Sequence, residues 1–589
     1  MGAFWSLLRR WRWKGRYYPI LVLLILLLVW PAIMLLIGGF RSAPPGSPAD
    51  WTVQAIPALL AKAELFQAIF NSFKLAVSAT LPALILAILF AWLSQRTTMT
   101  LRRVITPAMM LVFAMPSLFY ALAFDLFANR YNGYANSLIN LLGGSQIFQV
   151  DAESWSGLIG VTFLRATAFI YLFIAPAFRG LDIAHEDASL TCGRGRGRLA
   201  TFLLISLPML APAITGAVIL SFVAGLHSFD TPLILGEPVG IRVIATEIYD
   251  MLVNSYPPAY AEASLLSVAL VVFVALLCIV QSFIMGRRGY ITVTGKRTTQ
   301  PLLPLGKWAW AANTLVILFL LLAIVAPFLS LIYGALQPYP GVYGQISLMH
   351  FGRVFTQPGI WQAIITTLKL SVTVGAAAMV LAVMLCLTSR HFSPRIRSVV
   401  RFSTLLPYAM PGIVAALSVT WAWLSLPGLK LLYGTVWMMM LAFIVVVMPF
   451  AMQAANAVTS QLSHELGEAA RIAGASMLQS VFQITGPLIL PGFLVGWFFI
   501  AIIIAGNLDI PLLLGSPTLS TIASQTYLLQ SQGQTGDAAA LLICTLLLLI
   551  AVALIGAGIK FVWRRRHARL RQQPAPASSV LRPQESEYS

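Results

Sequence analysis

Two charged turns between apolar segments hold the residues best suited to binding another protein. The second turn, His464–Pro491, reads HELGEAARIAGASMLQSVFQITGPLILP. A weaker copy, HEDASLTCGRGRGRLATFLLISLPMLAP, occupies His185–Pro212 in the first half of the chain. Because a charged turn occurs twice in a chain that is otherwise mostly apolar, the pattern predicts a docking surface.

The second turn predicts a short helix with a defined beginning and end. Ser463 can cap its N-terminus, and Glu465 and Glu468 lie near the positive end of the helix dipole. Gly474 ends the helix, because glycine adopts the left-handed C-cap conformation at low cost. An alternative is an amphipathic helix lying on the membrane, but two copies favour docking in a groove of another protein. The small apolar surface consists of Leu466, Ala469, Ala470, Ile472 and Ala473.

Two ionisable residues fall within predicted membrane segments, where an unpaired charge costs several kcal/mol. Arg165, in GVTFLRATAFIYLF, is interpreted either as part of a structural ion pair or as lining of a translocation path. Asp125, in ALAFDLFANR, is interpreted as a residue near the outer interface. A pairing of the two is one hypothesis.

The segment HSFDTPLILGEPVGIRVIATEIY (His227–Tyr249) has enough acidic residues to raise the question of a metal site. Its ionisable residues lack compact ligand spacing, so we predict no metal site. We instead expect a re-entrant or gate-forming loop between the fifth and sixth spans of each half, with the two aspartates capping or fixing the turn. The candidate gate or translocation residues are Asp230, Pro232, Asp509 and Pro511, together with Arg165.

The segment GYITVTGKRT resembles a phosphate-binding loop only superficially. Gly289 and Gly295 are separated by five residues instead of four, and Lys296 is followed by Arg297 instead of Ser or Thr. We therefore expect no ATPase motif, catalytic residue or bound cofactor in this chain. A membrane-embedded enzyme is disfavoured because the sequence lacks a clustered His, carboxylate or nucleophile constellation.

The composition indicates an all-α polytopic membrane protein. Of the 589 residues, 59% are hydrophobic and only 10% are charged, whereas soluble domains carry roughly 25% charged residues. Apolar runs of about 20 residues, each long enough to cross a bilayer as a helix, recur about twelve times. They lie near 19–39, 75–94, 104–128, 157–179, 200–226, 264–285, 309–336, 368–388, 400–425, 434–456, 487–506 and 538–562.

The net charge of +19 is explained by membrane orientation. With a cytoplasmic N-terminus, most Lys and Arg residues fall in cytoplasmic segments, as the positive-inside rule requires. Both termini are then cytoplasmic, and the first apolar run is a retained anchor without a cleavage site. A role for the basic ends in binding nucleic acid or anionic lipid is the less favoured alternative, so the lipid bilayer is expected as a partner and nucleic acid is not.

The chain contains a repeat. AMPSLFYAL at 114–122 matches AMPGIVAAL at 409–417, and FDTPLILGEP at 229–238 matches LDIPLLLGSP at 508–517. An even number of helices in each half predicts parallel repeats related by an axis along the membrane normal. The expected domains are a first repeat with its N-terminal cytoplasmic segment (1–285), a cytoplasmic linker (286–308), a second repeat (309–563), and a basic, disordered cytoplasmic tail (564–589).

The second turn resembles the EAA loop of permease subunits in binding-protein-dependent ABC importers, and Glu468, Ala469, Ala470, Gly474 and Pro487 match its pattern. In that family the loop is a coupling helix that seats in a groove of a cytoplasmic ATPase. The resemblance implies the type I importer permease fold, with about six helices in each repeat. The resemblance implies two kinds of partner. One is a cytoplasmic ATPase, present in two copies, which uses ATP. The other is an external solute-binding protein. The implied location is the bacterial inner membrane.

The first turn departs from the EAA pattern. Aligned without gaps, Gly195 corresponds to Gly474, and Ser189 replaces the glutamate. A two-residue insertion instead pairs Asp187, Ala188 and Ser189 with the EAA triplet and Gly193 with the glycine. We prefer the insertion. In both registers the acidic contact is weaker or shifted, so the two coupling turns are expected to be asymmetric.

The fused arrangement and the segments FDTPLILGEPVGI and YITVTGK most resemble ferric-iron permeases. Thiamine, polyamine and phosphonate permeases are alternatives, because the external binding protein usually sets specificity in this class. A secondary transporter could also have twelve helices in two parallel repeats. It would be expected to carry coupling-ion carboxylates in its helices, and these are scarce here.

Overall fold

The computed structural model describes residues 18–143, 149–181, 191, 198–286, 302–339, 341, 344–389, 392–460, 472, 474, 479, 483, 485–516 and 518–551. Over these ranges the chain is built from helices joined by short turns, and it contains isolated β-bridges but no strand. The all-α architecture follows from the long apolar runs, because only a helix satisfies every backbone polar group within its own segment in lipid.

The first half contains the following elements: α2 (Tyr18–Leu24), η1 (Ile25–Val29), α3 (Trp30–Gly38), α4 (Ala55–Leu60), α5 (Ala63–Arg96), α6 (Arg102–Ala114), α7 (Ser117–Ala128), α8 (Tyr134–Leu141), α9 (Trp155–Gly180), α11 (Arg198–Thr201), η2 (Phe202–Ser206), α12 (Leu207–Leu226), η3 (Pro232–Gly236), η4 (Glu237–Val239), α13 (Ile244–Val253) and α14 (Tyr260–Gly286).

The second half repeats this order: α15 (Trp308–Leu320), η5 (Leu321–Val325), α16 (Ala326–Leu336), α17 (Met349–Thr356), α18 (Pro358–Ser389), α19 (Pro394–Leu405), η6 (Leu406–Ala409), α20 (Gly412–Leu424), η7 (Leu429–Leu432), α21 (Val436–Thr459), α24 (Gly486–Ala505), α25 (Asp509–Leu514) and α26 (Ile522–Ser531). A final apolar helix begins at Thr535 and is described to Ala551.

The protein is a multi-pass membrane protein. Nine described helices are long and apolar enough to cross a bilayer. Two further predicted spans, 104–128 and 400–425, are each broken into two helices, bent by 96° and 116° respectively. The last predicted span, 538–562, begins within the helix Thr535–Ala551 and continues outside the described residues. The total of twelve therefore remains a prediction.

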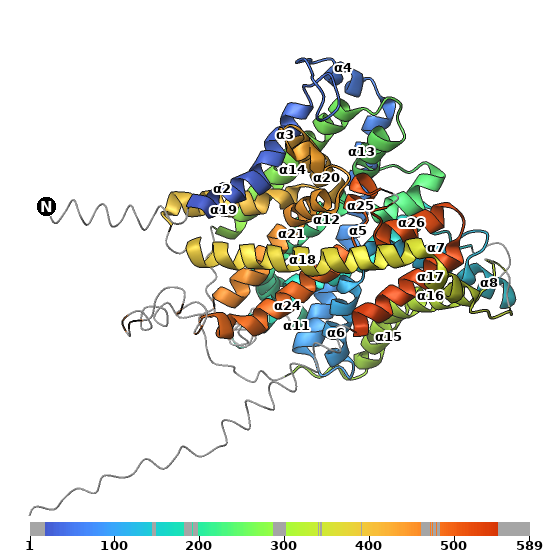
Figure 1. Ribbon diagram of the computed structural model, residues 1–589. Coiled ribbons are helices and arrows are strands. Elements are labelled where there is room, and N and C mark those ends of the chain that lie inside the picture. The colour runs from blue at the N-terminus through green and yellow to red at the C-terminus, as the bar shows by residue number, and fades with distance from the viewer. Residues whose placement is uncertain are drawn as a thin grey trace, which may run out of the picture.

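Two spans begin earlier than their apolar runs predict. α5 starts at Ala63 and has 34 residues, and α18 starts at Pro358 and has 32. At 1.5 Å per residue each helix is roughly 50 Å long, which exceeds the ~30 Å hydrocarbon core. The added turns of α5 carry polar residues such as Glu64 and Asn71, which hydropathy alone does not assign to a span. α18 runs across the middle of the molecule in Figure 1 as one long yellow helix.

The repeat predicted from the sequence appears in the packing. In the first half α5, α9 and α12 pack on one another, and in the second half α18, α21 and α24 do the same. Equivalent hydrogen bonds fix the short helix after each loop. The Ile244 backbone N–H donates to Ser72 Oγ at 2.8 Å, and the Ile522 N–H donates to Thr367 Oγ1 at 2.8 Å.

The first span of each half packs against the other half. α3 lies on α20, and α16 lies on α7. A glycine permits each close crossing. A Cβ added at Gly38 would lie 2.4 Å from the Trp421 ring, and a Cβ added at Gly334 would lie 2.8 Å from the Leu126 side chain. The two repeats are therefore intertwined, and the surface between them is buried inside one bundle.

Candidate functional site

The two bent spans break at equivalent prolines. Pro116 and Pro411 adopt extended conformations with ψ of 147° and 155°. Proline lacks the N–H that would continue the helical ladder, and it pushes the preceding residue out of the helical region. Each break therefore exposes the carbonyl end of one half-helix and the N–H end of the next. Groups of this kind must find partners at membrane depth.

An aspartate from the predicted gate loop caps the N-terminus of each second half-helix. Asp230 accepts hydrogen bonds from the Ser117 hydroxyl and the Leu118 N–H at the start of α7. Asp509 accepts from the Gly412 N–H at the start of α20. A carboxylate at a helix N-terminus satisfies orphan donors and is stabilised by the helix dipole. The aspartates were expected to cap or fix their own turn. The structure places both on a second element, and Asp509 in addition accepts a hydrogen bond from its own backbone N–H.

The carbonyl ends of the breaks have different partners in the two halves. Arg165, inside α9, donates from Nη2 to the Met115 carbonyl at 3.5 Å. His227 forms a hydrogen bond with the backbone of Ala409, at the end of η6 in the other repeat. The second repeat has no arginine equivalent, because ten residues into α21, where α9 has Arg165, the chain has Val446.

A cavity of about 390 Å³ lies at the meeting point of the two breaks and is lined by both repeats. Of the candidate gate or translocation residues, the structure brings Arg165, Asp230 and Asp509 together in its lining. Pro232 and Pro511 are buried in η3 and α25 beside their aspartates. Whether solute passes here is a prediction taken up below.

The polar groups of this interface cavity are incompletely paired. Asp230 is 5% exposed. Its Oδ1 is buried and accepts no hydrogen bond from a backbone N–H, hydroxyl, amide or basic side chain. The Asp509 carboxyl lies within hydrogen-bonding range of it. Arg165 Nε and His227 Nε2 are also buried without partners. Buried polar groups in this state require water or a ligand, so the cavity is built for polar contents.

A second, larger cavity of about 1160 Å³ lies toward the ends of α21 and α24 that lead into the second predicted coupling turn. The two cavities share five aromatic side chains, which we call the aromatic collar. Within it, the ring centroids of Phe113 lie 5.8 Å from Phe169 and 6.2 Å from Phe499. The collar consists of Phe113, Phe169, Tyr408, Phe450 and Phe499.

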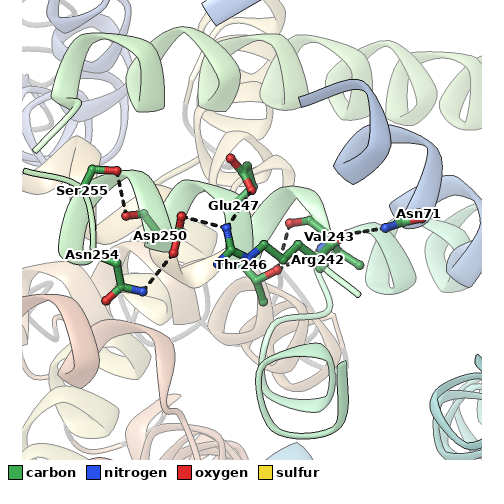
Figure 2. A network of polar contacts seen from close by, with 8 residues as sticks. All are labelled: Asn71, Arg242, Val243, Thr246, Glu247, Asp250, Asn254 and Ser255. Carbon is green, nitrogen blue, oxygen red and sulfur yellow. Dashed lines mark hydrogen bonds and ion pairs between the residues drawn. The ribbon is translucent and has the colours of Figure 1, made fainter. Parts of the chain in front are cut away.

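The far end of the first gate loop is fixed by a polar network (Figure 2). Arg242 Nη1 donates to Asp250 Oδ2 at 2.9 Å and lies 4.0 Å from Glu247 Oε2. Asn71 Nδ2 of α5 donates to the Arg242 carbonyl at 2.8 Å. The acidic residues considered for a metal site are thus divided. Glu247 and Asp250 contact Arg242, whereas Asp230 faces the interface cavity.

The network also sets the ionisation of Glu247. Burial raises the pKa of the Glu247 carboxyl, and the negative charge of Asp250 raises it further, while Arg242 lowers it. Glu247 is 4% exposed. Arg242 therefore offsets part of the cost of burying the Glu247 carboxylate.

Most residues of the two predicted coupling turns lie outside the described residues. These are Asp187, Ala188, Gly193, Gly195, Glu468, Ala469 and Ala470. Gly474 is described, and its φ of 88° is the left-handed conformation expected for a glycine that ends a helix. Ile472, from the predicted apolar surface, is 88% exposed. The contact with an ATPase remains a prediction.

The hypothesis of an Asp125–Arg165 pair is wrong. Asp125 accepts hydrogen bonds from Asn129 at 3.0 Å and from Gln530 at 2.8 Å. The Arg165 guanidinium instead lies near Asp230 and 5.7 Å from the centre of the Tyr120 ring. Asp125 is near the end of α7, whereas Arg165 lies at the break, so the two are held at different depths.

Sequence reasoning missed three parts of the site: Ser117 and Gly412, which donate to the aspartates, and the aromatic collar. A signal for the first two was present, because AMPS and AMPG place a proline at equivalent positions inside apolar runs. The collar has no such signal, since its residues come from five helical segments far apart in the sequence.

Residues 376–566 match the family described as the binding-protein-dependent transport system inner membrane component. The ferric transport system permease protein FbpB of Actinobacillus pleuropneumoniae is 26% identical over 491 residues, covering 82% of this chain and 68% of that protein. The putative FbpB 1 of Haemophilus influenzae is 25% identical, covering 81% and 73%. The thiamine transport system permease protein ThiP of Escherichia coli is 27% identical, covering 40% and 42%.

Proposed function

We propose that this chain is a fused permease of the binding-protein-dependent ABC importers and that its solute is ferric iron. The observation that carries the proposal is the coverage of the two ferric permease relatives, which match about four fifths of the chain and include both repeats. The thiamine permease matches 40% of the chain, so thiamine is the second candidate.

The proposed route runs through the interface cavity and the larger cavity, with the aromatic collar between them. Arg165, Asp230 and Asp509 line the first cavity, and Pro232 and Pro511 shape the loops that bring the aspartates there. In a discontinuous helix, the ends of the half-helices commonly mark a solute pathway at membrane depth. Movement of one repeat against the other would open the route on alternate sides.

The energy source and the partners belong to the same proposal. Two copies of a cytoplasmic ATPase bind the turns containing Glu468 and Asp187 and supply ATP hydrolysis, and this chain is expected to bind no cofactor of its own. A solute-binding protein delivers the solute from outside. The location is the bacterial inner membrane, with both termini cytoplasmic. The positive-inside distribution of Lys and Arg supports this orientation.

Uptake of radioactive solutes by cells lacking and then regaining this gene tests the proposal. We expect the restored cells to accumulate ⁵⁵Fe³⁺, with uptake lost when the ATPase gene is removed. Excess thiamine, putrescine, phosphonate and molybdate serve as competitors in parallel samples. Uptake of labelled thiamine instead of iron would overturn the ferric assignment in favour of the second candidate.

A further inference from the structure

We propose that the interface cavity binds a cationic solute through the carboxyls of Asp230 and Asp509. The inference rests on the proposed function and deepens it by assigning a class of solute to a place in the permease. Each repeat supplies one carboxyl, so the site exists only where the two repeats meet.

The charged residues that line the interface cavity favour a cation. Among the described residues that line the cavity, the Asp and Glu residues are Asp230 and Asp509, and the single Lys or Arg is Arg165. Arg165 already donates to the Met115 carbonyl and is electrostatically paired with Asp230. The two carboxyls face each other within hydrogen-bonding range and can share one proton. When that proton is released, one negative charge is left over, which a positive solute would neutralise.

The Asp230 carboxyl has an oxygen that accepts no hydrogen bond. Asp230 Oδ2 accepts from Ser117, whereas the buried Oδ1 has no permanent donor and faces the opposite carboxyl. Two carboxylates at this range repel each other unless a proton or a cation lies between them. Hard cations prefer carboxylate and hydroxyl oxygens, and the hydroxyls of Ser228 and Thr231 also line the cavity.

An oxyanion is the alternative solute for this cavity. Arg165 Nε and His227 Nε2 lack partners and would be its donors. An anion in the same cavity would also meet both carboxyls, which repel it. The lining therefore favours a cation.

The strength of the site suits transport. The described residues contain no group of three or more His, Cys, Asp or Glu side chains that could hold a metal ion tightly. A translocation site must bind well enough to admit the solute and weakly enough to release it. Two carboxyls with supporting hydroxyls meet both requirements.

The experiment measures binding of Tb³⁺, a hard trivalent probe, to the full chain in phosphatidylcholine nanodiscs. Tb³⁺ emission is sensitised by excited tyrosine, and Tyr408 lines the cavity. We expect Asp230→Asn and Asp509→Asn each to weaken Tb³⁺ binding by about tenfold or more. Asparagine remains a good helix cap, so the breaks are preserved. Asp125→Asn, a buried carboxyl outside the lining, is the matched control and should bind as the unmodified chain does.

The outcomes separate this inference from the ferric assignment. Unchanged Tb³⁺ binding in both aspartate variants, or displacement of Tb³⁺ by molybdate but not by Ga³⁺, overturns the cation site. If those variants lose Tb³⁺ while the unmodified chain imports thiamine, also a cation, the ferric assignment fails and the cation site stands. If ⁵⁵Fe³⁺ uptake is present and both variants retain uptake and Tb³⁺ binding, the ferric assignment stands and the cation site fails.

Discussion

Gly412, the first residue of α20, is the position where the smallest substitution should disturb the site. An added Cβ would lie 2.3 Å from Asp509 Oδ2, 2.7 Å from its Cβ and 2.8 Å from its Cγ. Because the Asp509 Cβ belongs to a short side chain at the start of α25, between the buried residues Leu508 and Ile510, the collision cannot be relieved by rotating a flexible end. We expect Gly412→Ala to move Asp509 off the α20 N-terminus.

The expected magnitude follows from two opposing terms. Overpacking of a buried site costs typically 1–3 kcal/mol. Alanine regains at most about 1 kcal/mol of helix propensity, and less at the first turn. Net destabilisation of roughly 0–3 kcal/mol is therefore expected, together with a loss of solute uptake because the carboxyl is displaced.

The matched control is Gly359→Ala, near the start of α18, where an added Cβ would meet nothing within 4 Å. Thermal unfolding in nanodiscs and cellular uptake should be measured for both variants. The second control is Gly412→Ala in an Asp509→Gly background, where removal of the opposing Cβ should abolish the added cost. The reasoning is refuted if Gly412→Ala is as stable and as active as Gly359→Ala.

Three further predictions follow from the same contacts. Gln530→Ala removes the donor of the 2.8 Å hydrogen bond to the buried Asp125 carboxyl. Thermal unfolding should therefore show a loss of about 1–3 kcal/mol in the free energy of unfolding. The control Gln532→Ala, at an exposed position, should show no loss, and equal losses would contradict a stabilising role for the Gln530–Asp125 hydrogen bond. Arg165→Ala should abolish uptake while sparing expression, and normal uptake would exclude Arg165 from the pathway. Gly474→Pro and Glu468→Lys should reduce uptake and ATPase co-purification more than Asp187→Lys does, and equal defects would refute the asymmetry of the coupling turns.

The long helices and the repeat could be predicted from the sequence because each depends on a pattern within a short segment of the chain. A run of about 20 apolar residues identifies a span, and the matched AMPS/AMPG and FDTP/LDIP blocks identify equivalent positions. The same blocks located the aspartates that meet in the cavity. Hydropathy could not reveal that the spans containing AMPS and AMPG are bent, because a broken span and a straight one have the same mean hydropathy.

The partners of the site residues could not be predicted, because they depend on packing between distant segments. Asp230 and Asp509 are 279 positions apart in the chain and meet only because the two repeats intertwine. The Asp125–Arg165 hypothesis failed for the same reason, since Arg165 packs at the helix break on Met115, whereas Asp125 bonds to Gln530 of the other repeat. The collar likewise requires the three-dimensional arrangement of both halves.

The most direct test of the proposed function is solute uptake by proteoliposomes containing this chain, the proposed ATPase and the proposed binding protein. We predict ⁵⁵Fe³⁺ accumulation that requires both internal ATP and the loaded binding protein, and that falls in Asp230→Asn and Asp509→Asn. Accumulation driven by an ion gradient without ATP would contradict the proposed function.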